Sequence, residues 1–189
     1  MTIRFAVPAD CIAVRAIYAA YIDTPITFEC TLPSETAFAD RMRGILQTYP
    51  YLVAEEAGRI VAYAYASRQR EREAYQWNAE LSVYVDPVHT SQGIGRALYT
   101  ALIELLRQQG IRTVYGSVTV PNEKSERLHR AMGFRVLGTF HRTGYKKGRW
   151  HDVAWFEKTI APYDADPEPF RPIREISADR LSAVLQTKL

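Results

Sequence analysis

The chain has 189 residues, of which 47% are hydrophobic and 24% are charged, as is usual for one globular domain. The formal net charge is only +3 and the basic residues are dispersed, so nothing indicates nucleic-acid binding. The first 20 residues lack a signal-peptide pattern, and no apolar stretch is long enough to cross a bilayer. We therefore expect a cytoplasmic protein that binds neither nucleic acid nor membrane.

A metal site is not expected either. Cys11 and Cys30 do not form a C-x-x-C pair, and the four histidines are scattered along the chain. Two thiols without suitably spaced imidazoles do not match the ligand patterns of structural zinc sites.

The first third of the chain predicts a strand, two helices and a hairpin. A strand at residues 2–7 leads into a helix that starts at Pro8. We expect its apolar face to comprise Ile12, Ile17, Ala20 and Tyr21. A second helix, residues 34–46, is capped by Ser34. Strands at residues 51–55 and 60–67 flank a turn at Gly58.

The loop between the two helices, residues 24–31, carries Phe28 and Glu29. It is either a pocket wall or a cap over the core.

A strand that runs into a glycine turn lies at residues 80–96. Side chains alternate along a strand, so Leu81, Val83 and Val85 share one face while Glu80, Ser82 and Tyr84 share the other. The strand should end near Asp86, and a helix should run from about Gly93 to Gly110. The free N–H groups of a helix start, with glycines that let a ligand come close, can bind a diphosphate, and Arg96 adds a positive charge there. The alternative is that Gly-x-Gly is only a tight turn.

A further helix, residues 121–132, carries a neutral polar stripe beside its apolar side. Asn122, Ser125 and His129 recur at spacings of three and four residues. The stripe is suited to a ligand wall, and the alternative is a set of caps and local hydrogen bonds.

The remaining segments complete a set of alternating elements. Strands are expected at residues 75–85, 113–118, 134–139 and 153–159, with a turn-rich segment between the last two. Residues 162–172 contain four prolines and predict an extended tail, followed by a short helix at residues 177–188. We therefore expect one domain at residues 1–161 and a C-terminal tail at residues 162–189.

This order of elements, together with several local motifs, resembles the GNAT superfamily of N-acetyltransferases. Within it, the sequence is most similar to the phosphinothricin and methionine sulfone/sulfoximine acetyltransferases. The motifs that carry the resemblance are residues 75–80, 82–87, Gly93-Ile-Gly95 with Leu98-Tyr99, Pro121-Asn122, Arg127-Leu-His129, Gly133-Phe134 and residues 144–153. The resemblance covers about residues 1–176 and implies an α/β (mixed α+β) fold. Its central sheet would be mixed, mostly antiparallel and splayed, with about four flanking helices.

The resemblance implies that acetyl-CoA is the co-substrate. The implied binding residues are Val83, Tyr84, Val85, Gln92, Gly93, Ile94, Gly95, Arg96, Asn122 and Ser125. Backbone groups of residues 83–85 would pair with the pantetheine arm as an added strand does. The family pattern has Gln or Arg three residues before the first glycine, whereas this chain has Thr90, so backbone donors are expected to hold the diphosphate.

The resemblance also implies a catalytic pair, Glu80 and His129. An amine must lose a proton before it attacks a thioester, and Glu80 would take that proton if Phe28, Tyr75 and Trp77 desolvate it. His129 would stabilise or protonate the leaving thiolate, or hold a water molecule. The implied residues around the small amino-acid-like acceptor are Phe28, Glu29, Arg70, Arg72, Tyr75 and Trp77.

The implied assembly is a homodimer. Other readings are acetylation of a peptide N-terminus, polyamine or aminoglycoside, or acyl-CoA binding without turnover.

Overall fold

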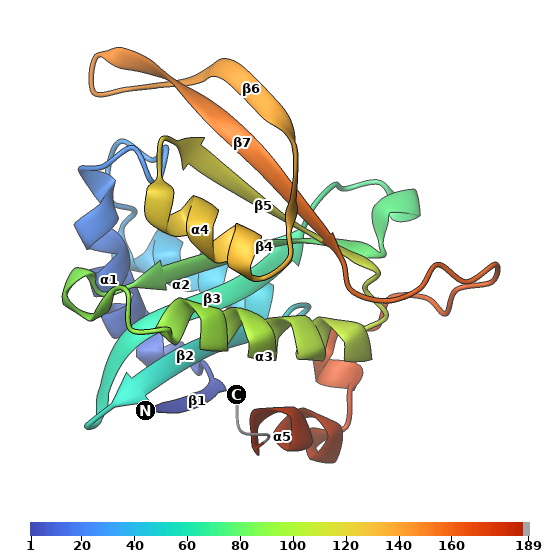
Figure 1. Cartoon of the computed structure of the whole chain (residues 1–189). Helices are drawn as coiled ribbons and strands as arrows, with labels where there is room; N and C mark the ends of the chain where they lie inside the picture. Colours follow the sequence, from blue (N-terminus) through green and yellow to red (C-terminus); the bar gives the residue numbers. More distant parts are fainter. Residues whose placement is uncertain (187–189) are drawn as a thin grey trace.

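The computed structural model describes residues 1–186 and has a seven-stranded sheet at its centre (Figure 1). In spatial order the strands are β1 (Thr2–Phe5), β2 (Tyr51–Glu56), β3 (Arg59–Arg68), β4 (Asn78–Val85), β5 (Thr113–Val120), β7 (Arg149–Thr159) and β6 (Arg135–Lys146). Neighbouring strands are antiparallel except β4 and β5, which are parallel. The predicted mixed, mostly antiparallel sheet is confirmed.

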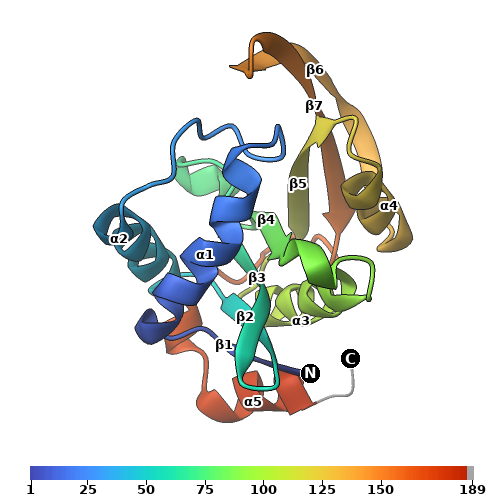
Figure 2. The ribbon, with the colours of Figure 1, turned by 90° about the vertical axis from the view of Figure 1, so that its left-hand side faces the viewer.

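Within residues 1–186 there are five α-helices: the four expected to flank the sheet and the short helix expected near the C-terminus. They are α1 (Cys11–Ile22), α2 (Glu35–Leu46), α3 (Ile94–Gln108), α4 (Glu123–Ala131) and α5 (Ala178–Gln186). Figure 2 shows α1 and α2 on one side of the sheet and α3 and α4 on the other. Each side has its own apolar core, so the sheet is buried on both faces.

The parallel pair β4–β5 separates after three residues. Only Asn78–Glu80 pair with Thr113–Tyr115. Beyond this point β4 stays paired with β3 as far as Val85, and β5 stays paired with β7 as far as Val120. The sheet therefore opens as a fork whose base is at Glu80, and the edge of β4 that faces the fork is left unpaired from residue 81 to 85.

The two faces of β4 follow the predicted alternation. Leu81, Val83 and Val85 pack in the core beneath α3. Tyr84 points to the α1 side, where its ring contacts the rings of Tyr18 and Tyr63. Glu80 lies on the same face as Tyr84, because side chains two and four residues apart share a face.

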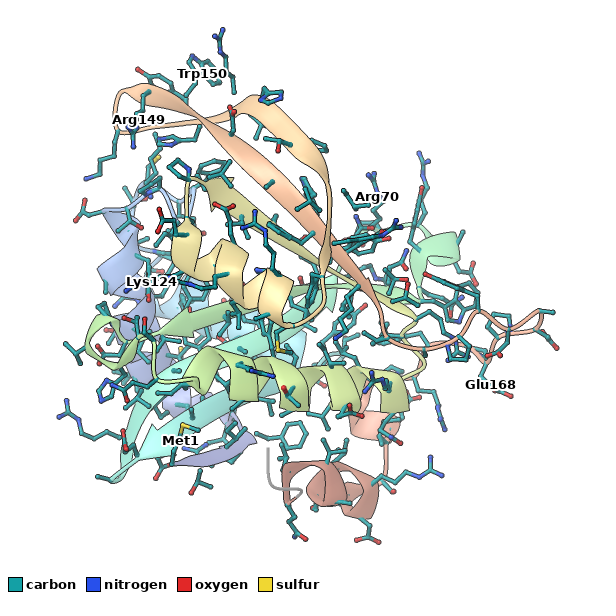
Figure 3. All side chains as sticks on the ribbon, in the orientation of Figure 1. Met1, Arg70, Lys124, Arg149, Trp150 and Glu168 are labelled. Carbon is teal, nitrogen blue, oxygen red and sulfur yellow. The ribbon has the colours of Figure 1, made fainter. Side chains whose placement is uncertain are left out.

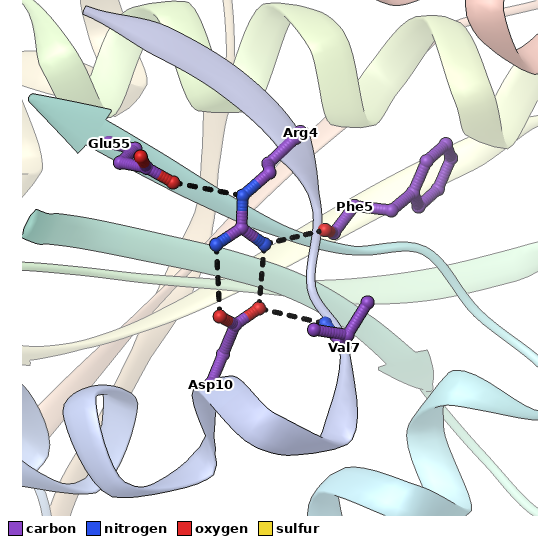
Figure 4. A network of polar contacts seen from close by, with 5 residues as sticks. All are labelled: Arg4, Phe5, Val7, Asp10 and Glu55. Atoms are coloured by element: carbon purple, nitrogen blue, oxygen red, sulfur yellow. Dashed lines mark hydrogen bonds and ion pairs between the residues drawn. The ribbon is translucent and has the colours of Figure 1, made fainter. Parts of the chain in front are cut away.

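The start of the chain is fastened to the sheet by a polar network around Arg4 (Figure 4). Its guanidinium donates to both oxygens of Asp10, at 2.7 and 2.9 Å, and to Glu55 at 3.0 Å. The Asp10 carboxylate also accepts from the N–H of Val7 at 2.8 Å. Hydrogen bonds from Arg4 hold the pKa of Asp10 below its usual value. This network fixes β1 against β2 and sets the start of α1.

The predicted apolar face of α1 is partly wrong. The buried residues are Cys11, Val14, Ile17 and Tyr18, whereas Ile12 is 72% exposed. A short 3₁₀ turn, Pro8–Asp10, precedes the helix and changes its phase.

The segment between the last two strands is also not turn-rich as predicted. It forms the long β6–β7 hairpin, which bends at two register shifts in β6. The only reversal is at Lys147 and Gly148, both with positive φ, as in a two-residue hairpin turn. Similarly, β4 begins at Asn78 rather than at the predicted Tyr75, because Glu73–Tyr75 form a 3₁₀ turn.

Residues 162–176 lie against the domain and connect β7 to α5. Trp77 Nε1 donates to the carbonyl of Glu168 at 2.9 Å, and the buried Gln109 side chain donates to the carbonyls of Thr48 and Arg171, both at 2.8 Å. The expected last helix is present as α5, which packs its apolar side chains on the α3 core. Residues 187–188 of that expected helix lie outside the described range. Within residues 1–186, no helix has both the length and the apolar character needed to cross a membrane.

Candidate active site at the fork of the sheet

A carboxylate occupies the base of the fork. The side chain of Glu80 accepts a hydrogen bond from Ser117 Oγ on β5, with 2.5 Å between Oγ and Oε1. Burial raises the pKa of Glu80, and the Ser117 bond partly offsets this effect. A carboxylate with a raised pKa is a better base than an exposed one, so Glu80 is suited to remove a proton from a ligand.

A cavity of about 540 Å³ adjoins this carboxylate and draws its walls from both sides of the sheet. On the α3–α4 side the lining residues are Leu81, Val83, Tyr99, Val118, Asn122, Ser125 and His129. On the α1 side they are Ile26, Thr27, Phe28, Ser82, Tyr84, Ser117, Thr119, Phe140, Thr143, Val153 and Trp155. Because the cavity passes through the fork, two ligands can approach Glu80 from opposite faces of one sheet.

A helix start with free donors lies next to the α3–α4 side of the cavity, near Val83, although its own residues are not part of the lining. Gly93 has φ +83°, and the first helical hydrogen bond runs from Ala97 N to Gly93 O. The N–H groups of Ile94, Gly95 and Arg96 therefore have no partner within the helix and can receive an anion.

A lysine from another element reaches the loop before this helix. Lys124 Nζ, on α4, donates to Thr90 Oγ1 at 3.0 Å (Figure 3). Thr90 stands where the family pattern has Gln or Arg. Lys124 places a positive charge beside Thr90. No sequence signal connects these two residues, which are 34 positions apart.

The polar stripe on α4 serves both of the roles that the sequence left open. Asn122 caps the helix, because its Oδ1 accepts from Ser125 N at 3.2 Å and its own N–H donates to Glu126. Asn122, Ser125 and His129 also line the cavity. The stripe therefore caps the helix and also lines the cavity, and its role as a ligand wall stays a prediction.

His129 is almost fully enclosed, with 2% of its surface exposed. Its ring contacts the rings of Tyr99, Phe134 and Phe156, and burial lowers its pKa. Nδ1 lies 2.8 Å from the carbonyl of Ser125; a carbonyl can only accept, so Nδ1 carries the proton. In the neutral ring Nε2 then has only a lone pair, and within residues 1–186 it has no hydrogen-bond partner.

Glu29 does not present a free carboxylate to the cavity. It accepts from Arg41 at 2.5 Å and from the hydroxyl of Tyr18 at 2.7 Å. Burial alone would raise the pKa of Glu29, but these two hydrogen bonds outweigh it and lower the value. Tyr18 also bonds Thr27 Oγ1 at 2.6 Å, so this network supports the loop that covers the cavity.

The same loop is fastened to the β6–β7 hairpin. The buried Lys146 donates to the carbonyls of Thr24 and Thr27, at 2.7 and 2.6 Å. The ring of Phe28 lies against Gly144, where any Cβ would collide with it. We call this contact between residues 24–28 and the hairpin the latch, and it holds Phe28 as a wall of the cavity.

Five of the six predicted acceptor-binding residues lie outside the cavity lining: Glu29, described above, and Arg70, Arg72, Tyr75 and Trp77. The guanidinium of Arg70 stacks over the ring of Tyr75, 5.6 Å from its centroid, and Figure 3 shows Arg70 far from the hairpin tip. Arg72 is exposed at the start of the 3₁₀ turn. Trp77 is bonded to the C-terminal segment. None of the described residues that line the cavity is charged.

Sequence reasoning missed Ser117, Tyr99, Trp155 and Lys146. Ser117 and Trp155 are directly opposite each other on the neighbouring strands β5 and β7. These strands are far apart in the chain, so residues near either position do not indicate how the two strands pair. Tyr99 was available as part of a motif, yet only the packing of α3 shows that it reaches the cavity.

The chain belongs to the GNAT acetyltransferase family, because residues 3–155 match the family model of the acetyltransferase (GNAT) domain. The resemblance inferred from the motifs is thus confirmed. Its curated relatives include a phosphinothricin N-acetyltransferase from Streptomyces viridochromogenes, 37% identical over 175 residues, which cover 92% of this chain and 95% of the relative. Another is an L-methionine sulfoximine/L-methionine sulfone acetyltransferase from Salmonella typhimurium, 35% identical over 87% of this chain and 98% of the relative.

A solved structure supports the same assignment. A phosphinothricin acetyltransferase from Sinorhizobium meliloti, in complex with acetyl-CoA, matches with a TM-score of 0.83 and 35% identity. The match covers 94% of this chain and 96% of that one.

Proposed function

We propose that this protein transfers the acetyl group of acetyl-CoA to the amino group of a small amino-acid-like acceptor. The observation that carries the proposal is the position of Glu80. It is a partly buried carboxylate with a raised pKa at the point where the sheet opens into a cavity that is lined from both faces.

The α3–α4 side of the fork fits acetyl-CoA. The unpaired edge of β4 offers backbone groups to the pantetheine arm, and the N–H groups of residues 94–96 with Lys124 offer donors to phosphate groups. Asn122 and Ser125 form the opposite wall. The hydroxyls of Tyr21 and Tyr99 already donate to the carbonyls of Val85 and Leu81, so Val83, which faces the same edge, is left to make most of the pairing.

On the other face, Glu80 acts as the general base. Its carboxylate takes a proton from the ammonium group of the acceptor, directly or through one water molecule, and Ser117 keeps it oriented toward the fork. Acetyl-CoA supplies an electrophilic thioester carbon, to which the free amine adds while the C–S bond breaks. CoA leaves as the thiolate, the nitrogen loses its extra proton to form the neutral amide, and the thiolate takes up that proton or one from solvent. No side chain of the protein becomes acetylated in this direct transfer.

His129 supports the reaction as a neutral hydrogen-bond acceptor. Its lowered pKa and the Nδ1–H bond to Ser125 leave no proton on Nε2, so the ring does not protonate the leaving thiolate. Of the roles that the sequence left open, holding a donor such as water fits this tautomer. A thiol has a pKa of about 8.5, which makes the thiolate a weak enough base to leave without an acid.

The acceptor side is suited to a compact amino acid rather than a peptide. The latch closes the cavity over Phe28, and the lining residues are apolar or neutral. A polar but uncharged side chain, such as a sulfone or sulfoximine, fits this lining, and the relatives named above act on phosphinothricin and methionine sulfoximine or sulfone. Arg70, outside the lining but near the fork base, remains the candidate partner of the acceptor carboxylate.

Glu80→Gln tests the proposed base. Turnover should fall by roughly 10²- to 10⁴-fold, while the dissociation constant of CoA by calorimetry stays within about twofold. Glu104→Gln, which removes an equal charge on α3, is the control and should keep full turnover. Unchanged turnover in Glu80→Gln would remove Glu80 as the base.

The acceptor class is tested by CoA release with phosphinothricin, methionine sulfone, methionine sulfoximine, a peptide, a polyamine and an aminoglycoside. We expect activity with the first three. Activity only with the others would move the protein to another acceptor class, and no activity at all would favour acyl-CoA binding without turnover. The homodimer and the cytoplasmic location remain predictions. Light scattering would test the first, and cell fractionation would test the second.

A further inference from the structure

The indole N–H of Trp155 is a buried donor without a partner at the acceptor side of the cavity. Nε1 has no hydrogen-bond partner within residues 1–186, while the residue is part of the cavity lining. A buried unpaired donor is destabilising, and such groups in native proteins are commonly paired with a ligand or with water. The reaction proposed above makes no use of it.

The register of the sheet places Trp155 close to the reacting groups. Ser117 on β5 and Trp155 on β7 are direct partners, so their side chains project from the same face. Ser117 is bonded to Glu80. The three residues thus form a row across β4, β5 and β7 on the face where the acceptor binds.

The ring that partly covers the indole can move. Phe140 packs against Trp155 with 5.8 Å between ring centroids, and it is 57% exposed. An exposed side chain can change rotamer when a ligand binds. A ligand can therefore displace Phe140 and reach the edge of the indole ring.

The chemistry of an indole N–H defines what it recognises. It donates and cannot accept, so it pairs with an oxygen and not with an ammonium group. We propose that Trp155 Nε1 donates a hydrogen bond to an oxygen on the side chain of the acceptor, of the sulfone, sulfoximine or phosphinate type. This proposal rests on the proposed function and makes Trp155 a specificity-determining residue within it.

The first test compares two acceptors that differ only by two side-chain oxygens, L-methionine sulfone and L-methionine. Trp155→Phe keeps an aromatic ring but removes the donor. It should lower kcat/KM for the sulfone by about five- to tenfold and for methionine by less than twofold. Trp150→Phe, on the same strand but exposed at the hairpin tip, is the matched control and should change neither value. An equal effect of Trp155→Phe on both acceptors, or no effect on either, would overturn the proposal.

The second test needs binding only. In ¹H–¹⁵N NMR spectra of the protein with CoA bound, the indole resonance that disappears in Trp155→Phe should shift on addition of methionine sulfone and not of methionine. Should the wild type acetylate neither of these compounds nor phosphinothricin or methionine sulfoximine, the proposed function fails, and this titration alone decides the role of Trp155. An unmoved resonance contradicts it.

Discussion

At the scale of single residues, the pairing of Glu80 with Ser117 decides how strong a base the site contains. Burial raises the pKa of the carboxylate, and the hydroxyl donor lowers it again because it stabilises the ionised form. The sequence predicted the carboxylate but attributed its environment to Tyr75, Trp77 and Phe28. Of these, only Phe28 lines the cavity.

Ser117→Ala therefore has an effect with a defined sign. Without the donor, the pKa of Glu80 rises further, and the base must be ionised to work. The acid limb of the pH profile of kcat should move to higher pH, with a loss of turnover below that limb and a smaller change above it. Ser117→Thr, which keeps the hydroxyl, should restore the profile. A profile that stays in place in Ser117→Ala would mean that the 2.5 Å contact has no influence on the base.

Lys124 is the second residue whose effect can be measured alone. Replacing it by Gln removes the charge beside Thr90 and should weaken CoA binding by roughly tenfold, with most of the loss disappearing at high salt. The control is Arg130→Gln on the same helix, where Arg130 pairs with Glu126. Equal CoA affinity in Lys124→Gln and wild type, measured by calorimetry at low salt, would contradict this role.

At the scale of elements, the latch between residues 24–28 and the β6–β7 hairpin closes the acceptor side. Lys146→Met should free the loop, because Met fills similar space but cannot donate to the carbonyls of Thr24 and Thr27. We expect a rise of about tenfold in KM for the acceptor, with the KM for acetyl-CoA almost unchanged. Arg149→Met, which removes an exposed positive charge from the same hairpin, is the control. A parallel rise in both KM values would indicate general unfolding instead, which a melting curve would reveal.

The C-terminal segment is a second element whose contribution can be tested. Phe170 packs on Tyr49, and Ile173 and Ile176 are buried, so the segment covers apolar surface of the domain. Ending the chain at residue 161 exposes this apolar surface and removes the Arg171 carbonyl, one of the two acceptors of the Gln109 side chain. We expect the melting temperature to fall by at least about 10 °C. Ending the chain at residue 186 should have little effect. Equal melting temperatures for the chains that end at residues 161 and 186 would show that the segment adds no stability.

At the scale of the whole molecule, the fork brings two substrates together from opposite faces of one sheet. In the proposed direct transfer, both substrates must be bound before the acetyl group moves. Initial-rate plots against both substrates should therefore intersect, as in a sequential mechanism. Parallel lines, or an acetylated protein seen by mass spectrometry after incubation with acetyl-CoA alone, would contradict direct transfer.

The order of the elements and the position of the base were predictable because they depend on local patterns. Alternation along residues 80–85, the glycine turn at residues 93–95 and the cap at Asn122 are all read from neighbours in the chain. The motifs shared with the family then predicted how these elements are arranged in the fold. The phase of α1 and the extent of the β6–β7 hairpin were predicted wrongly, since a 3₁₀ turn and long-range strand pairing override local preference.

The sequence by itself determined that a carboxylate, a glycine-rich helix start and a polar helix stripe serve one acyl transfer. Only the tertiary structure decided which groups surround that carboxylate and where each ligand can enter. Each decisive contact spans 34 or more positions of sequence: Ser117 bonds Glu80, Lys124 bonds Thr90, Lys146 bonds the loop at residues 24–28, and Trp155 is the strand partner of Ser117. Contacts at such separations follow from strand register and packing, which neighbouring residues do not encode.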